Sequence, residues 1–256
     1  MSDFVRHGSI VREIWSDGDT ILVIFAAAAA EFALNRAVDW LFVTRRLPSD
    51  PLARLFSTVS YAQRIALGGR VEAERAVSGI RAAHAAVERK RGARIPDWAY
   101  KDVLYMLVDG SERAFERLRR PLTASEREEL YGVFRRLGEG LGMAGLPGSY
   151  GAWKIDRERH LQRDLVYSPY TQALYAAYRR QLGPWRYRLL LQLQAAVVHE
   201  RVRALLDLPR LAWMGAALPV YGGAAGWHGL RALVRRALIP PAYLQAVRAL
   251  DRPSTG

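Results

Sequence analysis

Three polar side chains share one face of a predicted helix near residue 58. Arg54, Thr58 and Tyr61 follow an i, i+4, i+7 spacing within RLFSTVSYAQR, which stacks them along one stripe of an α-helix. Most of the residues between them are apolar. A polar stripe on a mostly apolar helix indicates either an edge exposed to solvent or the lining of a site.

A histidine lies on the apolar face of the next predicted helix. Val77, Ile80, His84 and Val87 are spaced i, i+3, i+7 and i+10, and alanines flank His84 on both sides. Small neighbours let a large flat group approach a helix closely, but alanines are also good helix formers. Taken alone, the pattern favours a histidine satisfied within the core over a metal ligand.

The other four histidines carry weaker patterns. His160 lies in the charged segment IDRERHLQRD and is interpreted as solvated or ion-paired, whereas His199 is expected to form an interhelical hydrogen bond. His7 is close to the N-terminus and His228 lies in a glycine-rich turn. No two histidines have the i, i+4 spacing of a helical zinc site, and the sequence lacks phosphate-loop and nucleophile-elbow motifs.

Composition excludes several classes of site. The sequence has no cysteine, which rules out disulfides, thiolate metal ligands and iron–sulfur clusters. It has 38 lysines and arginines against 25 carboxylates, a net charge of +13, and three of the basic residues are lysines, which leaves 35 arginines. The arginines are spread along the chain without a basic arm or a known motif, so we expect no nucleic-acid partner.

Two apolar stretches could contact or span a membrane and therefore bear on where the protein is located in the cell. ILVIFAAAAA, residues 21–30, is too short to span a bilayer and predicts a buried helix. LAWMGAALPVYGGAAG, residues 211–226, contains Pro219 and several glycines, so it is interpreted first as a buried C-terminal segment and second as a surface that touches a membrane. The N-terminus shows no signal-peptide pattern, so we expect a cytoplasmic protein, with peripheral membrane contact as the alternative.

The elements that must position these residues are helices. Alanine, leucine, arginine and glutamate dominate, and strand-like alternation is scarce, so we predict an all-α fold and one domain over residues 1–256. Thr123 and Glu126 form a capping box, and Gly183-Pro184 interrupts a helical segment. The expected helices are 9–16, 19–35, 50–67, 71–91, 97–118, 124–141, 151–163, 171–182, 185–206 and 228–237.

The order of these segments resembles a known family. RLFSTVSYAQR followed about two dozen residues later by IRAAHAAVE resembles the haem-binding domain shared by MpaB-type oxygenases and latex-clearing (rubber) oxygenases. DVLYML, RPLTASEREELYGVFRRLGEGLGMAGLP, RERHL and YRRQLGPWRYRLLLQLQ continue the resemblance in the same order. Each segment is loose, but their order over residues 10–210 makes the combination specific, with residues 211–256 as a C-terminal covering segment.

The resemblance implies a role for each residue of the two helices. It implies an all-α domain that encloses a b-type haem, with His84 as the axial ligand of the iron, and it reverses the preference for a core histidine. Arg54 and Thr58 match the family's arginine and threonine and are expected to line the haem pocket and take part in catalysis, with Arg54 contacting a haem propionate or bound oxygen. Tyr61 is a further cofactor contact or a packing residue. The alternative for Arg54 is a surface salt bridge to Asp50.

The sequence also departs from the rubber oxygenases. Ser57 stands where they have a lysine. They also have a glutamate on the distal side of the haem, upstream of the arginine, and the carboxylates near that place in this sequence are Glu31 and Asp39. The downstream segments favour the MpaB-like branch. The resemblance therefore implies a haem b-dependent oxygenase that uses O₂ to cleave a C=C bond in a hydrophobic, isoprenoid-like substrate. The alternatives are a haem-binding sensor or carrier, and a haem-free structural or membrane-associated relative.

Overall fold

The computed structural model describes residues 3–42, 51–209, 213–223 and 228–251, and only the backbone for residues 41, 51–57, 228 and 230. Within these ranges the protein is helical, without strands, and an isolated bridge joins Asn35 to Leu165. The predicted all-α class is confirmed. The elements are α1 (Ile10–Ser16), α2 (Gly18–Leu34), η1 (Arg36–Phe42), α3 (Pro51–Leu67), α4 (Arg70–Arg91), α5 (Asp97–Leu118), α6 (Ala124–Gly140), α7 (Tyr150–Asp164), α8 (Pro169–Val197), α9 (Glu200–Leu205), α10 (Met214–Gly223), α11 (His228–Leu238), η2 (Pro241–Tyr243) and α12 (Leu244–Arg248).

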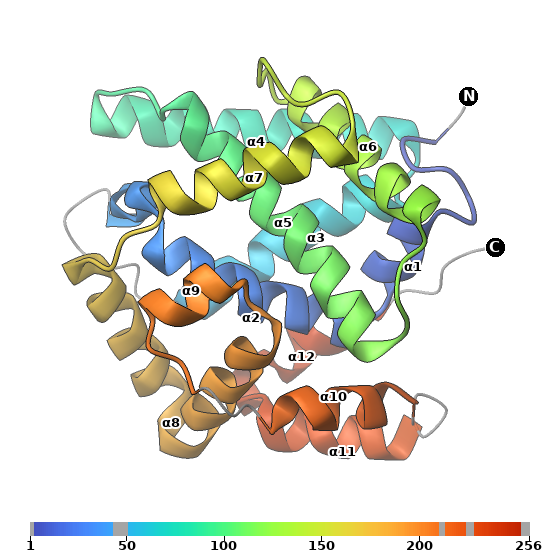
Figure 1. The fold of residues 1–256 in the computed structure, drawn as a ribbon, viewed down its shortest axis with the longest axis vertical. Helices are drawn as coiled ribbons and strands as arrows, with labels where there is room; N and C mark the ends of the chain where they lie inside the picture. The colour runs from blue at the N-terminus through green and yellow to red at the C-terminus, as the bar shows by residue number, and fades with distance from the viewer. Residues whose placement is uncertain (1–2, 43–50, 210–212, 224–227, 252–256) are drawn as a thin grey trace.

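The alanine-rich helix α2 forms the centre of the molecule (Figure 1). Fifteen of its 17 residues are buried, which confirms the prediction of a buried helix at residues 21–30. Its small side chains let α5 and α8 pack closely against it. A Cβ added to Gly110 of α5 would lie 3.5 Å from the carbonyl oxygen of Ile24, and Gln194 of α8 donates a hydrogen bond of 3.1 Å to the Ala26 carbonyl.

Local sequence signals fix most of the helix ends. The Thr123–Glu126 capping box is present, since Glu126 N donates to Thr123 Oγ1 at 3.2 Å and Thr123 N donates to Glu126 Oε2 at 2.8 Å. Gly183 adopts φ 73°, in the left-handed region that glycine tolerates, and divides α8 into two helical parts as predicted. The expected continuous helix 185–206 is wrong at Val198 and His199, where the chain is extended; helix resumes as α9, which His199 caps by accepting a hydrogen bond from Arg201 N at 3.2 Å.

The C-terminal apolar stretch is only partly buried. Leu218 and Gly222 of α10 pack inward, and a Cβ at Gly222 would lie 1.6 Å from the Leu118 carbonyl oxygen, so only glycine fits there. Trp213 and Val220 are exposed. The preferred interpretation of a buried segment therefore holds only for the inner face of α10, the outer face is open to solvent, and residues 211, 212 and 224–226 lie outside the described ones. Among the helices of the described ranges, none combines the length and the apolar character needed to cross a bilayer.

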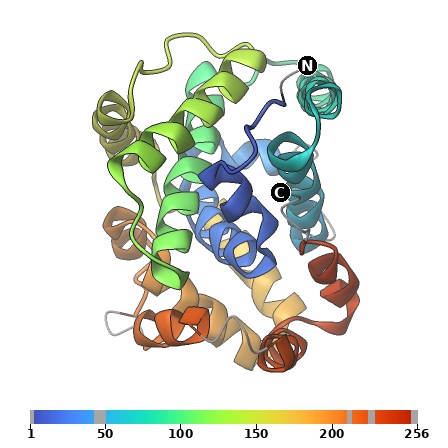
Figure 2. The same ribbon diagram turned by 90° about the vertical axis from the view of Figure 1, so that its right-hand side faces the viewer.

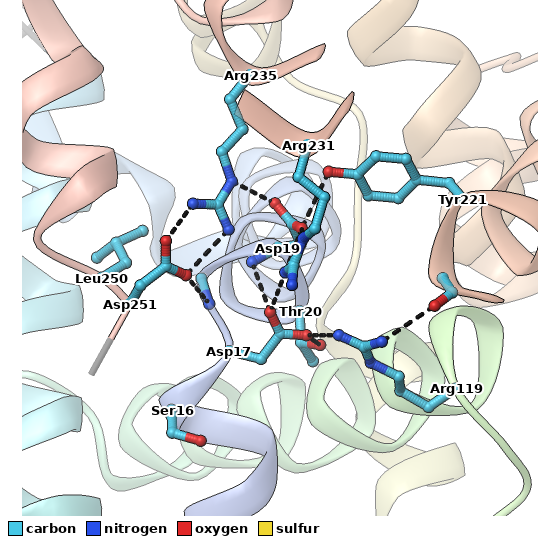
Figure 3. Close-up of polar contacts among 12 residues, drawn as sticks. Ser16, Asp17, Asp19, Thr20, Arg119, Tyr221, Arg231, Arg235, Leu250 and Asp251 are labelled. Atoms are coloured by element: carbon cyan, nitrogen blue, oxygen red, sulfur yellow. Dashed lines mark hydrogen bonds and ion pairs between the residues drawn. The ribbon is translucent and has the colours of Figure 1, made fainter. Parts of the chain in front are cut away.

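A cluster of ion pairs fastens α11 to the N-terminal end of α2 (Figure 3). Arg231 Nη2 lies 2.6 Å from Asp17 Oδ1, and Arg235 Nε lies 2.6 Å from Asp19 Oδ1. Arg235 also pairs with Asp251. Acidic side chains at the start of a helix interact favourably with its unpaired N–H groups. Asp17 and Asp19 are therefore stabilised both by the N-terminus of α2 and by the arginines of α11. We call Asp17, Asp19, Arg119, Tyr221, Arg231, Arg235 and Asp251 the C-terminal clasp.

The clasp makes folding stability sensitive to acid. Burial by itself would raise the pKa of Asp17, but hydrogen bonds from Arg119 and Thr20 and the charges of Arg119 and Arg231 lower it from 3.8 to about 2. A carboxyl whose pKa is lowered on folding stabilises the folded state above its unfolded pKa, and this contribution is lost as the pH falls through the folded pKa.

We expect the free energy of unfolding to lose roughly 2 kcal/mol from Asp17 as the pH falls from about 4 to about 2. Urea denaturation across this range measures the loss, with Asp17→Asn as the comparison. The variant should be less stable at neutral pH and show a correspondingly smaller acid-dependent loss. Parallel pH profiles of the parent and the variant would contradict the expectation.

Candidate functional site

The helical hairpin of α3 and α4 carries the residues singled out in the sequence. The two helices are joined at Gly68-Gly69 and pack against each other. Tyr61 of α3 lies against Gly79 of α4, where an added Cβ would be 3.1 Å from Tyr61 Cε1. Tyr61 is therefore directed towards α4. Thr58 lies one turn before Tyr61 and is exposed.

His84 lies further along the same pair of helices. In two antiparallel helices, three residues back from Tyr61 and five forward from Gly79 place Thr58 and His84 within about one helical turn of the same level. The position of Arg54 is defined only by the backbone of α3, and its side chain lies outside the described residues. Thr58, Tyr61 and His84 thus lie on neighbouring helices, but His84 is five residues and about 140° around α4 from Gly79, so its ring meets Tyr100 of α5 and is not directed at the Tyr61 contact.

The His84 ring lies beside Tyr100, and Glu88 in turn binds the Tyr100 hydroxyl. The half-buried imidazole meets the ring of Tyr100 edge-on, at 5.0 Å between centroids and 62° between planes. The Tyr100 hydroxyl donates to Glu88 Oε1 at 3.4 Å, and Ile95 N donates to the same oxygen at 2.8 Å. Burial, then the Glu88 carboxylate, raises the pKa of Tyr100 to about 12, so the hydroxyl keeps its proton at neutral pH. On the solvent side, the alanines Ala82, Ala83 and Ala86 are exposed.

Glu31 and Asp39, the two carboxylates compared with the distal glutamate of the rubber oxygenases, are both paired with arginines. Asp39 of η1 pairs with Arg91, whose guanidinium stacks on Trp40 at 4.1 Å from the ring centroid. Glu31 of α2 accepts two hydrogen bonds from Arg157 of α7, at 2.6 and 2.5 Å. Burial raises the pKa of Glu31, and this guanidinium opposes the rise. Neither carboxylate is placed as an uncompensated base.

A buried cluster of His160 with several carboxylates was not predicted from the sequence. His160 of α7 is only 6% exposed, so the interpretation as solvated is wrong and that as ion-paired is confirmed. Its Nδ1 contacts Asp102 Oδ1 and lies 3.4 Å from Asp164 Oδ2, while its Nε2 lies 3.8 Å from Asp156 Oδ2. Asp156, His160 and Asp164 are spaced four residues apart, which was the visible signal, but Asp102 comes from α5.

The cluster can be read as a metal site or as an ion-pair network. Asp102, His160 and Asp164 each offer a ligand atom, and these atoms lie within 4.8 Å of one another, so the group could hold a metal ion. However, Arg163 already binds Asp164 at 2.6 and 2.9 Å, and Asn35 donates to Asp102 at 2.6 Å. Because these groups are satisfied by protein partners, we interpret the cluster as a buried network that joins α5 to α7.

We expect His160→Ala to lower the free energy of unfolding by about 3 kcal/mol, because it removes the imidazole from buried carboxylates. Chemical denaturation measures the change. His199→Ala is the matched control, since His199 is half-buried and caps a short helix, a role worth about 1 kcal/mol. Equal losses in the two variants would show that the carboxylate cluster adds nothing to the stability.

A polar cavity of about 380 Å³ lies between α5 and α7, away from His84. It is lined by charged residues that include Asp109, Glu112 and Arg157, together with Trp153 and His199. Arg157 Nε and Trp153 Nε1 are buried without a hydrogen-bond partner among the described atoms. Such a lining suits water or a polar solute rather than an alkene.

The comparison with known families confirms the resemblance seen in the sequence. The model of a family described as "ER-bound oxygenase mpaB/B'/Rubber oxygenase, catalytic domain" matches residues 13–236. This range runs from α1 into α11 and includes both helices of the hairpin. Comparisons with curated proteins and with solved structures found no match for this chain.

Proposed function

Because this chain belongs to the family of mpaB-type and rubber oxygenase catalytic domains, we propose that it is a haem b-dependent oxygenase with His84 as the axial ligand. The proposed reaction is the O₂-dependent cleavage of a carbon–carbon double bond in a hydrophobic, isoprenoid-like substrate. Membership of an oxygenase family supports an enzyme; the haem, the bond cleaved and the substrate class are the proposal.

The observation that carries the proposal is the setting of His84. A half-buried imidazole lies on α4 beside the Tyr100 ring, and the neighbouring helix α3 carries Thr58 and Tyr61. A b-type haem needs one protein nitrogen and an approach free of bulky neighbours. His84 offers such a nitrogen on a partly exposed imidazole, and this supports its assignment as the ligand.

In the proposed reaction the protein would bind and orient the haem and donate hydrogen bonds. When bound, the haem would supply the iron that reacts with O₂, and this chemistry belongs to the cofactor. His84 would hold the group through one ring nitrogen, and the Tyr100 ring limits how the imidazole can turn. Thr58 carries a hydroxyl that can donate a hydrogen bond, and Arg54 carries a guanidinium suited to a carboxylate of the cofactor. We assign no catalytic base, because Glu31 and Asp39 both pair with arginines.

The test is to purify the protein from cells supplied with haem precursor, and to measure haem per chain and the visible spectrum. O₂ uptake is then followed with a panel of isoprenoid alkenes, and the products are examined for new carbonyl groups. Haem at about one per chain with alkene-dependent O₂ uptake supports the proposal. Haem without turnover would indicate a sensor or carrier, and a protein that takes up no haem would indicate a structural relative.

A further inference from the structure

The positive charge of the protein is concentrated in one third of the chain. Residues 165–250 contain eleven arginines and two carboxylates, Glu200 and Asp207, which gives +9 of the total net charge of +13. The arginines are spread along the whole chain, so the asymmetry arises because carboxylates are almost absent from this third. An uneven charge of this size creates a local positive potential.

Part of the charged third, from the bend of α8 and from α10 and α11, lies at one end of the molecule. Figures 1 and 2 both place α10, α11 and the bend of α8 together at the lower end, away from α4 and α7. Arg186 of α8 donates a hydrogen bond of 3.1 Å to the Ala237 carbonyl at the end of α11, which joins these helices directly. Arg179, Arg180, Arg188 and Arg236 are exposed at this end, and none forms an ion pair with a described residue.

The same end exposes large apolar side chains. Trp185 is 46% exposed, Trp213 53%, Leu233 65% and Val220 75%. Trp213, Ala216 and Val220 follow an i, i+3, i+7 spacing, so they share the outer face of α10 while Leu218 and Gly222 are buried beneath them. Tryptophan and aliphatic residues beside arginines are the composition of a surface that lies in a lipid headgroup region.

The C-terminal clasp fixes which face of α11 points outward. Arg231 and Arg235, four residues apart, are held against Asp17 and Asp19 at the start of α2 (Figure 3). Leu233 lies about 200° around the helix from Arg231, and it is exposed. The ion pairs therefore hold Leu233 and Arg236 on the solvent side. The orientation of this outer face is therefore set by the fold.

We propose that the outer faces of α10 and α11, with the bend of α8, form a docking surface for a membrane that contains anionic lipids. Exposed arginines meet the headgroups, and Trp185, Trp213, Val220 and Leu233 enter the interfacial region. A nucleic acid would use the arginines but leave the apolar residues without a role. A second copy of the chain would bring two surfaces of the same charge together. The inference does not depend on haem.

The test uses flotation of the whole protein with vesicles of phosphatidylcholine, with and without about 30% phosphatidylglycerol. We expect binding only to the anionic vesicles, and weaker binding as salt rises. The triple variant Arg180→Gln, Arg188→Gln, Arg236→Gln should bind about a hundredfold more weakly, at about fivefold per arginine. Its matched control is Arg75→Gln, Arg81→Gln, Arg89→Gln on α4, which removes the same charge from exposed positions at the other end.

The apolar part is tested in the same assay. Val220→Ser with Leu233→Ser should weaken binding by at least about tenfold, whereas Val71→Ser with Ile155→Ser, exposed on α4 and α7, should leave it unchanged. Absence of binding to anionic vesicles overturns the proposal. Equal losses in the two arginine triples overturn it as well, because binding would then follow net charge and not this surface. A change in molecular mass of the surface variants with unchanged vesicle binding would assign the surface to a second copy instead.

Discussion

Replacing His84 with alanine is expected to abolish the Soret band at about 400 nm and the alkene-dependent uptake of O₂. In metalloproteins, loss of a residue that merely supports a metal ligand costs 10–100-fold in affinity, so loss of the ligand itself should cost more than about a hundredfold. The fold should survive, because His84 is half-buried and its neighbours on α4 are alanines. Haem titration followed by absorbance measures the first effect, and circular dichroism checks the second.

His199→Ala is the control for this experiment, since it removes another half-buried imidazole elsewhere in the protein. Added imidazole provides a stricter test, because a small ligand can occupy the space that the side chain leaves and return a nitrogen to the iron. We expect imidazole to restore the band in His84→Ala. A band that persists in His84→Ala, or one lost equally in His199→Ala, would remove His84 from its proposed role.

The sequence predicted the elements whose causes are local. The run ILVIFAAAAA has no polar face, so it had to be buried, and it became the central helix α2. Thr123 and Glu126 fix the start of α6, and Gly183 bends α8, because each acts on its own backbone. The break at Val198 was missed since neither glycine nor proline marks it, and the signal was a histidine used as a helix cap.

The polar clusters depend on contacts between distant parts of the chain. The sequence shows charged residues on both sides of His160. However, Asp102, its closest partner, lies 58 residues earlier and belongs to another helix. With 35 arginines in the sequence, no pattern indicated that Arg157 in particular would be buried against Glu31. The hairpin is the intermediate case: the spacing of Thr58 and Tyr61 predicted a shared stripe, but only the packing of Tyr61 on Gly79 shows which helix it faces.

The ion pair of Arg157 and Glu31 should be the most sensitive point of the fold. Both side chains are almost fully buried, at 6% and 7% exposure, and Asp109 lies 3.3 Å from the same guanidinium. We expect Arg157→Met to lower the free energy of unfolding by about 3–5 kcal/mol, because two buried carboxylates lose their partner. Urea denaturation at neutral pH measures the loss. Arg70→Met, which breaks an exposed pair with Glu74, should cost less than about 1 kcal/mol.

A second substitution separates the cost of an uncompensated charge from the worth of the pair itself. Glu31→Met combined with Arg157→Met removes both charges and leaves Asp109 with Arg113, 3.0 Å away. The double variant should recover much of the stability lost in Arg157→Met, since buried pairs replaced by apolar side chains are often neutral in stability. The double-mutant cycle then gives the coupling energy between the two residues. If Arg157→Met costs no more than Arg70→Met, the buried pair does not hold α2 to α7, and packing of the alanine-rich helix alone must position it.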